Sequence, residues 1–220
     1  MKKVLISAVA LVAFAMTANA QLFFGGQLGL STSGGTSEWT SGNTTTKTDN
    51  LKTTSFTFAP QVGFFLSESF AVGGYLNLGI TNQDNVGGTY NESKETTFGI
   101  TPFARYYFIN SGKWKVAAEG QLGFSLGHTT AKDGSGNIVS EPKTTTIAFN
   151  VRPLVAYSLT DNIDLQAGLN VLGLGFTHKT VKNEVGNTTA TDKTNNFGLS
   201  ANSNNIVSVG AITVGFIYKL

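Results

Sequence analysis

Apolar and polar residues alternate with a period of two along most of the chain after residue 20. In the C-terminal segment, Val214, Phe216 and Tyr218 share one face, and Thr213 and Lys219 share the other. A period of two is that of a β-strand with two different faces. Each such segment is long enough for the ~9–11 tilted residues of a strand that crosses a membrane. Eight segments show the pattern, at roughly 22–32, 53–66, 70–81, 96–109, 113–129, 144–159, 163–178 and 206–220.

The connections between these segments have two lengths. Three are tight and built from residues that favour turns, at 67–69, 110–112 and 160–162. Four are longer and polar, at about 33–52, 82–95, 130–143 and 179–204. Short turns at one end and long loops at the other are typical of bacterial outer-membrane barrels. The sequence therefore predicts an all-β fold, an eight-stranded antiparallel up-and-down transmembrane β-barrel with both termini on the periplasmic side.

Aromatic residues gather near the ends of the predicted strands. The set near the tight turns and the C-terminus comprises Phe64, Phe65, Phe70, Tyr106, Tyr107, Phe108, Trp114, Tyr157, Phe216 and Tyr218. A sparser set near the long loops comprises Phe56, Phe98, Phe124 and Phe176. Two such girdles flank the apolar band of a membrane barrel, because amphipathic rings settle at headgroup depth. The alternative is a soluble β-sandwich, which would bury its aromatic residues in the middle of the strands.

The first twenty residues have the pattern of an export signal. Two lysines begin it, an apolar stretch follows at 4–16, and the small residues Ala18 and Ala20 define a cleavage site before Gln21. The alternative is an N-terminal helix that stays in the folded protein. We expect a cleaved signal peptide at 1–20 and one outer-membrane β-barrel domain at 21–220.

The composition fits a chain whose side chains alternate between lipid and a wet interior. Charged residues make up 13% of it and hydrophobic residues 40%, and the mean hydropathy is +0.03. Globular domains usually carry about 25% charged residues. Without the two lysines of the signal, 15 − 2 = 13 basic residues balance 13 acidic ones, so no basic face predicts nucleic acid as a partner. The lack of cysteine excludes a disulfide and a lipoprotein anchor.

The C-terminus carries the most specific motif, a polar residue, a glycine and two hydrophobic positions at Thr213, Gly215, Tyr218 and Leu220. With it, the chain resembles the small outer-membrane β-barrel family of OmpA/OmpX type, in the form common in Bacteroidota and often labelled a porin family. Many members of that family end in phenylalanine, where this chain has leucine. The resemblance covers the barrel domain only. It implies a location in the bacterial outer membrane, contact with outer-membrane lipids and lipopolysaccharide, and recognition by the barrel-assembly machinery and periplasmic chaperones.

Charged residues on the inward face are the candidate functional residues. An eight-stranded barrel has room for its own side chains or one small ligand. Alternation turns Arg105, Glu119 and Arg152 inward on three successive predicted strands. Counting from the tight turns places Glu119 and Arg152 at one depth and Arg105 somewhat nearer the periplasm. We expect a luminal ion-pair cluster, because unpaired charges in a confined interior are costly. Its role is either structural or that of a gate that exchanges ion pairs.

Neither histidine belongs to a recognisable catalytic set. His128 lies at the loop end of its strand with Ser125 nearby, and His178 lies at the top of another strand. Some barrels of this size modify lipid A with surface histidine and serine residues, but the sequence offers no matching triad. Residues 133–137 begin like a calcium loop, yet Ile138 stands where glycine is required. We therefore expect no enzyme activity, no metal and no cofactor.

Three functional hypotheses follow from these features. The first is a structural or surface-interaction protein of the outer membrane, whose long extracellular loops contact an unknown ligand and whose lumen is closed by ion pairs. The second is a small or gated porin for ions and small solutes. The third is a lipid A-modifying enzyme. Conductance separates the first two, and analysis of lipid A tests the third.

Overall fold

The chain folds almost entirely into antiparallel β-strands. The computed structural model describes residues 20–87, 90–169, 172–185, 188–201 and 212–220. Within these ranges no helix has the length and apolar character that a membrane crossing requires. The described strands are β1 (Gln21–Ser33), β2 (Thr36–Ser41), β3 (Thr44–Asp49), β4 (Lys52–Ser67), β5 (Phe70–Gly87), β6 (Tyr90–Ser111), β7 (Trp114–Lys132), β8 (Ile138–Ser140), β9 (Lys143–Ser158), β10 (Ile163–Leu169), β11 (Leu172–Val185), β12 (Thr188–Ala201) and β13 (Ile212–Lys219).

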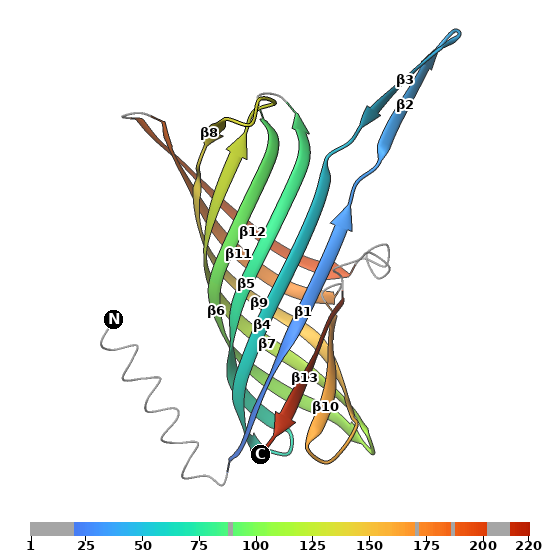
Figure 1. Cartoon of the computed structure of the whole chain (residues 1–220). Helices are drawn as coiled ribbons and strands as arrows, with labels where there is room; N and C mark the ends of the chain where they lie inside the picture. The colour runs from blue at the N-terminus through green and yellow to red at the C-terminus, as the bar shows by residue number, and fades with distance from the viewer. Residues whose placement is uncertain (1–19, 88–89, 170–171, 186–187, 202–211) are drawn as a thin grey trace.

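The strand pairings run in a circle. β1 pairs with β4, and β4 to β7 then pair in chain order. β7 pairs with β9, β9 with β10, β10 with β13, and β13 with β1. Every pairing is antiparallel. The ladder of backbone hydrogen bonds therefore returns to its first strand at the end that holds the tight turns, which we call the tight-turn end (Figure 1).

The opposite end, the loop end, differs from the sequence-based prediction. The segments expected as loops at 33–52, 82–95 and 179–204 are largely paired strand: β2 with β3, the extended ends of β5 and β6, and β11 with β12. Threonine is frequent there and favours the extended conformation, so backbone pairing continues without an apolar face. Figure 1 shows the β2–β3 hairpin projecting beyond the other strands.

The predicted count of eight strands is not confirmed, because thirteen strands are described. The predicted segment at 163–178 falls in two strands, β10 and β11, and the part of the last segment before residue 212 lies outside the described residues. β2, β3, β8 and β12 lie in segments expected as loops. β12 pairs with β11 and stands at one end of the sheet order. The prediction of an all-β antiparallel fold is confirmed.

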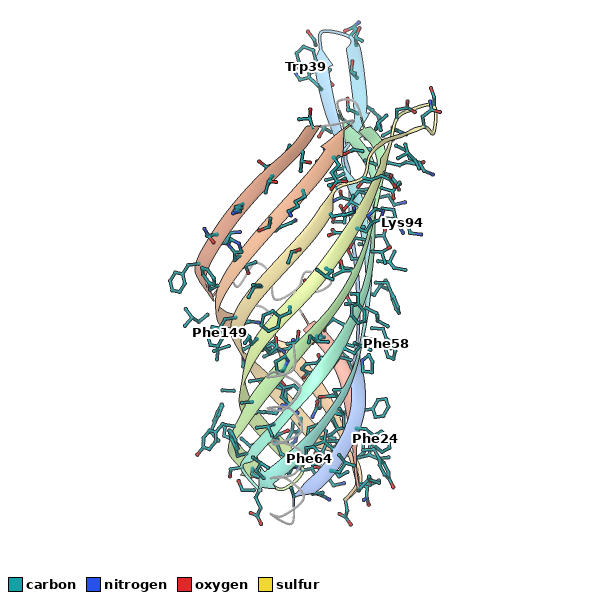
Figure 2. The ribbon with its side chains drawn as sticks, turned by 90° about the vertical axis from the view of Figure 1, so that its left-hand side faces the viewer. Phe24, Trp39, Phe58, Phe64, Lys94 and Phe149 are labelled. Atoms are coloured by element: carbon teal, nitrogen blue, oxygen red, sulfur yellow. The ribbon has the colours of Figure 1, made fainter. Side chains whose placement is uncertain are left out.

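Side chains alternate sharply between the two faces of the sheet. On β6, Phe98 and Phe108 are 51% and 55% exposed, whereas Arg105 between them is fully buried. The outward face is apolar on most strands, and Figure 2 shows Phe24, Phe58 and Phe149 pointing away from the ribbon. The inward face mixes aromatic with polar and charged residues. This is the reverse of a soluble protein, in which charged groups are almost never fully buried.

Aromatic rings fill the interior near the tight-turn end because small residues lie beneath them. Phe23, Gly63, Gly73 and Phe103 stand opposite one another on β1, β4, β5 and β6. A Cβ on Gly63 would lie 2.4 Å from Cζ of Phe23, and one on Gly73 would lie 2.6 Å from Cζ of Phe103. Only glycine therefore leaves room for both rings.

Two members of the predicted tight-turn girdle belong to this interior layer. Tyr107 is 3% exposed, and Phe65 packs against the buried cluster with its ring centroid 5.0 Å from that of Phe23. The girdle was assigned from closeness to the turns, whereas the direction of each side chain follows from its place in the alternation. Phe70, Tyr106, Phe108 and Trp114 do lie exposed on the outward face.

Candidate functional site

Three charged residues form one row across neighbouring strands. Arg105 on β6 stands directly opposite Glu119 on β7, and Glu119 stands directly opposite Arg152 on β9. Counting residues from the turns put Arg105 somewhat nearer the periplasm, whereas the strand pairing sets it directly opposite Glu119. The two strand pairings fix the register, and counting residues from the turns missed the register shift between Tyr107 and Ile109.

Ion pairs join these three residues. Each arginine contacts a different carboxylate oxygen of Glu119. Arg105 donates from Nε to Glu119 Oε2 at 2.9 Å, and its Nη2 donates to the same oxygen. Arg152 donates from Nε and Nη2 to Oε1 at 3.2 and 3.0 Å. The side chains of Arg105 and Glu119 are fully buried, and that of Arg152 is 6% exposed. Buried ion pairs of this kind need further hydrogen bonds to offset their desolvation.

Neutral side chains from other strands supply those further hydrogen bonds. Tyr75 donates its hydroxyl to Glu119 Oε2 at 2.9 Å, and Gln121 donates from Nε2 to Oε1 at 2.8 Å. Gln27 accepts from Arg152 Nη2 at 3.1 Å. The cluster thus draws on β1 and β5 as well as on β6, β7 and β9, and it crosses the interior. Tyr75 and Gln27 were not predicted, although their inward phase was a signal that could have identified them.

A second charged cluster lies closer to the tight-turn end. Asp164 is fully buried and accepts from Lys219 Nζ at 3.0 Å, from Lys115 Nζ at 3.1 Å and from Ser158 Oγ at 2.7 Å. The alternation in the C-terminal segment placed Lys219 on the same face as Thr213, but Asp164 was not predicted. That carboxylate follows a tight turn directly, and its two basic partners come from strands distant in the sequence.

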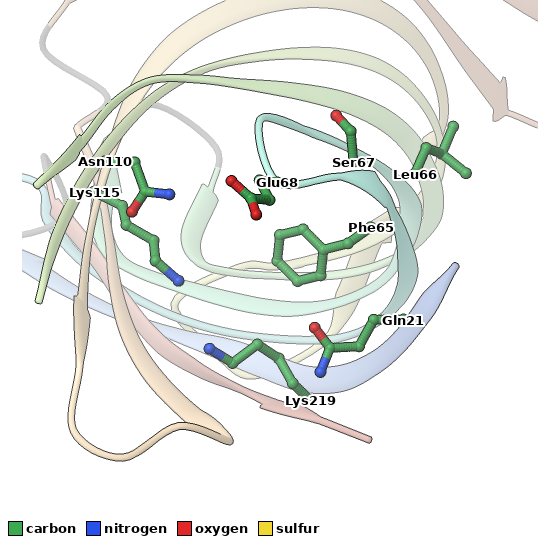
Figure 3. Close-up of a pocket in the computed structure, with 8 residues that line it drawn as sticks. All are labelled: Gln21, Phe65, Leu66, Ser67, Glu68, Asn110, Lys115 and Lys219. Carbon is green, nitrogen blue, oxygen red and sulfur yellow. The ribbon is translucent and has the colours of Figure 1, made fainter. Parts of the chain in front are cut away.

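Cavities lie on both sides of the central row. One of 320 Å³ opens at the tight-turn end, where Gln21, Glu68, Lys115 and Lys219 line it (Figure 3). The other, of 140 Å³, lies toward the loop end and is lined by Gln27, Tyr75, Asn77, Thr101, Gln121 and Arg152, among others. The row of Arg105, Glu119 and Arg152, with the aromatic layer, stands between the two.

The residues of the C-terminal motif lie on the strand that closes the circle, except Leu220, which directly follows it. β13 runs between β10 and β1. Gly215 lies so close to β1 that a Cβ there would be 2.2 Å from the carbonyl oxygen of Gly26. Tyr218 and Leu220 are exposed on the outward face, whereas Thr213 faces inward and lines the smaller cavity. Recognition of this motif by an assembly machinery stays a prediction.

The expected signal cleavage site lies at the edge of the described residues. Ala18 is outside them, Ala20 is the first described residue, and β1 begins at Gln21. The expected boundary therefore coincides with the start of the sheet. Cleavage itself stays a prediction.

The histidines do not form a set with the neighbouring serine. His128 is exposed on the outward face of β7, whereas Ser125 belongs to the inward face of the same strand. His128 Nε2 lies 3.7 Å from Glu141 Oε1, and His178 Nδ1 lies 2.6 Å from Asn195 Oδ1. A nucleophile and its base must lie within hydrogen-bond reach, so the arrangement gives the lipid A hypothesis no geometric support.

The segment that begins like a calcium loop is a tight turn after β7. Asp133 Oδ1 accepts the backbone N–H groups of Ser135 and Asn137, each at 2.9 Å. Gly136 has a φ of +84°, a conformation that favours glycine. These hydrogen bonds, with that from Asn137 first, lower the pKa of the Asp133 carboxyl below its ordinary value. The carboxylate therefore stabilises the turn.

Comparisons with known proteins gave structural matches only. No protein-family model and no curated protein matches the chain. It is similar to the crystal structure of Neisserial surface protein A, with 15% identity over 90% of this chain and 97% of that one and a TM-score of 0.40. It is also similar to a major outer membrane protein from Thermus thermophilus, with 12% identity over 92% and 100% of the two chains and a TM-score of 0.44.

Proposed function

We propose that this chain is an integral protein of the bacterial outer membrane, a β-barrel with a closed interior that acts through its surface-exposed strands and loops. The observation that carries the proposal is the reversed distribution of side chains. Apolar residues face outward along the strands, and the charged residues Arg105, Glu119, Arg152 and Asp164 are buried inside. An apolar exterior on a strand ladder that closes at the tight-turn end suits lipid as the surrounding solvent, because closure pairs the backbone groups of the strands there.

The apolar exterior is too extensive for a soluble monomer. Such proteins rarely expose a contiguous apolar patch beyond a few hundred Å². Here each strand of the circle carries exposed large apolar side chains: Phe24, Leu28, Phe58, Val62, Leu76, Leu78, Phe98, Ile100, Leu122, Phe124, Ile147, Phe149, Leu165, Val214 and Phe216. Outer-membrane lipids and lipopolysaccharide are the partners that such a surface fits, and the barrel-assembly machinery and periplasmic chaperones would deliver it there.

The packing of side chains in the interior favours a closed barrel rather than an open pore. Arg105 and Glu119 are fully buried, and Tyr75 and Phe103 beside them are 4% and 5% exposed. Hydrogen bonds join the side chains of Tyr75 on β5, Arg105 on β6 and Glu119 on β7. If the circle of β1, β4 to β7, β9, β10 and β13 closes as a barrel, its ring is only wide enough for such a filling.

The proposed surface role depends on the exposed residues at the loop end. The β2–β3 hairpin is exposed at every residue, and Trp39 on it is 72% exposed. Glu38 and Lys47 pair across the hairpin at 2.6 Å. Binding residues are often placed on segments held by a rigid scaffold. An extracellular ligand is therefore proposed to contact this hairpin.

Planar-bilayer recording tests the closed interior. The purified full chain is expected to insert without producing conductance steps above those of the protein-free bilayer. Regular steps from the wild type would overturn the closed barrel in favour of a porin. Location is tested separately in the native host, where the protein is expected in the outer-membrane fraction and recovery in the soluble fraction would reject the membrane assignment.

A gated pore is the second candidate, and one observation favours it. Cavities of 320 and 140 Å³ lie on the two sides of a single row of ion pairs. Rearrangement of Glu119 between its arginine partners, together with movement of the adjoining aromatic rings, would join them. The matched recording uses Glu119→Gln, whose side chain has nearly the same volume. A current that appears only in this variant supports a gate at Glu119, and silence in both proteins rejects the gate.

A further inference from the structure

Basic residues stand side by side on the outward face near the loop end. His128 on β7 is directly opposite Lys143 on β9, and Lys143 is directly opposite Lys182 on β11. Lys193 on β12 is opposite Thr180, which places it diagonal to Lys182. All four basic side chains are exposed. Residues directly opposite in an antiparallel pair have Cβ atoms about 5 Å apart, so the four form one patch, which we call the basic row.

The acidic residues nearby do not balance the basic row. Glu141 Oε1 lies 3.7 Å from His128 Nε2, and Glu184 Oε2 lies 4.0 Å from Lys143 Nζ. The lysines of the row on β11 and β12 make no ion pair within the described part of the chain. Like charges directly opposite each other destabilise a sheet. An anion held between these lysines would therefore stabilise this part of the wall.

A second row of charges on the outward face shows a different arrangement. Lys52 on β4, Asp84 on β5, Glu92 on β6 and Lys132 on β7 stand opposite one another in that order. Two positive and two negative charges cancel, with the acidic pair between the lysines. This second row is complete within the chain, whereas the basic row has a positive excess that an external anion can neutralise.

The basic row borders the apolar part of the outward face. Ile147 and Phe149 follow Lys143 along β9 toward the tight-turn end, and Phe176 on β11 stands opposite Phe149. These apolar side chains are 39%, 45% and 41% exposed. A strand rises about 3.3 Å per residue, so Ile147 lies about 13 Å along β9 from Lys143. A molecule with an anionic head and an apolar tail can contact both surfaces at once.

We propose that the basic row binds the phosphate groups of a lipid in the leaflet at the loop end, with its acyl chains against Ile147, Phe149 and Phe176. Lysine ammonium groups bind phosphate as point charges, and a phosphate between Lys143 and Lys182 separates their like charges. The inference rests on the proposed location in the outer membrane, and it names a lipid class and the side of the wall that holds it.

Native mass spectrometry of the refolded full chain, released from maltoside micelles, tests the site. The probe is diphosphoryl lipid A, and the comparison is the same lipid after removal of both phosphates. We expect the fraction of chains that carry one lipid to be severalfold higher for the phosphorylated form. Equal fractions for the two lipids would overturn the proposal, because the acyl chains alone would then account for binding.

A pair of double variants locates the site on the wall. Lys182→Gln with Lys193→Gln removes two charges from the basic row, and the bound fraction should fall severalfold. Lys52→Gln with Lys94→Gln removes two exposed lysines from β4 and β6 at the same end, and binding should stay at the wild-type level. An equal fall in both would show diffuse attraction to the loop end and reject the basic row.

Lys143→Gln is the second variant should the double substitution in the basic row fail to fold, as judged by circular dichroism. It removes the lysine in the middle of the row, and it too should lower the bound fraction. A wild-type fraction in this variant would count against the row. Fractionation of the native host separates this inference from the proposed function: recovery in the outer membrane together with equal binding of the two lipids rejects the lipid site alone.

Discussion

Tyr75 on β5 donates its hydroxyl to Glu119 on β7 across the interior, with 2.9 Å between Tyr75 Oη and Glu119 Oε2. The two strands are not neighbours, because β6 lies between them. The bond therefore links separate parts of the wall and helps to hold the buried carboxylate between its arginines. The same hydroxyl accepts from Arg105 Nη2 at 3.0 Å and from Gln27 Nε2 at 3.2 Å.

Tyr75→Phe removes this link while keeping the ring. We expect a loss of about 1–3 kcal/mol in the free energy of unfolding, because Glu119 and Gln27 each lose a hydrogen-bond partner in a buried place. Urea unfolding of the refolded protein measures the loss. Tyr106→Phe is the matched control, since Tyr106 is 56% exposed on the outward face, and its effect should stay within about 0.5 kcal/mol. Equal effects of the two substitutions would contradict the role of Tyr75.

Gly63→Ala tests the packing of the aromatic layer. A Cβ at this position would lie 2.4 Å from Phe23 Cζ and 2.6 Å from the backbone oxygen of Val72. Because the backbone atom cannot move aside easily, we expect a loss of about 1–3 kcal/mol in the free energy of unfolding. In the control Gly120→Ala the nearest atom is 3.9 Å from the new Cβ, so stability should be unchanged or slightly higher. A tolerated Gly63→Ala would show that the rings are not packed as described.

The carboxyl group of Asp133 should titrate at a lower pH than an ordinary aspartate. The backbone N–H of Asn137 gives the largest contribution to the lowered pKa. The stabilisation of the turn by the carboxylate is therefore fully present above the ordinary pKa and is lost as the pH falls through the lowered one. NMR titration of the side-chain carboxyl carbon measures it. Asn137→Pro removes the donating N–H and should move the pKa back toward the ordinary value; an unchanged pKa would exclude this cause.

The sequence predicted which residues face inward because a period of two assigns each strand residue to a face. Arg105, Glu119 and Arg152 were selected in this way, and the structure brings them together. Tyr75 and Asp164 were missed because contacts across the interior depend on the register of several strands at once. Alternation within one strand carries no information on that register.

The paired strands at the loop end could not be predicted from alternation. β2 and β3 contain mostly threonine and serine, and both of their faces are exposed. Their pairing comes from backbone hydrogen bonds and short side-chain contacts such as that between Thr40 and Thr45, 3.0 Å apart. Such a segment has no buried face that a hydropathy pattern would show.

Fluorescence of the two tryptophans tests the membrane assignment most directly. Trp114 is 56% exposed on the outward face and packs edge-on against Tyr157, with 4.8 Å between ring centroids, whereas Trp39 stands on the β2–β3 hairpin. The chain has no other tryptophan, so Trp39→Phe and Trp114→Phe each leave a single reporter. In bilayers brominated near the headgroups, Trp114 should lose most of its emission, and Trp39 should respond to aqueous iodide only. Trp114 that is quenched by iodide and unaffected by brominated lipid would contradict the outer-membrane barrel.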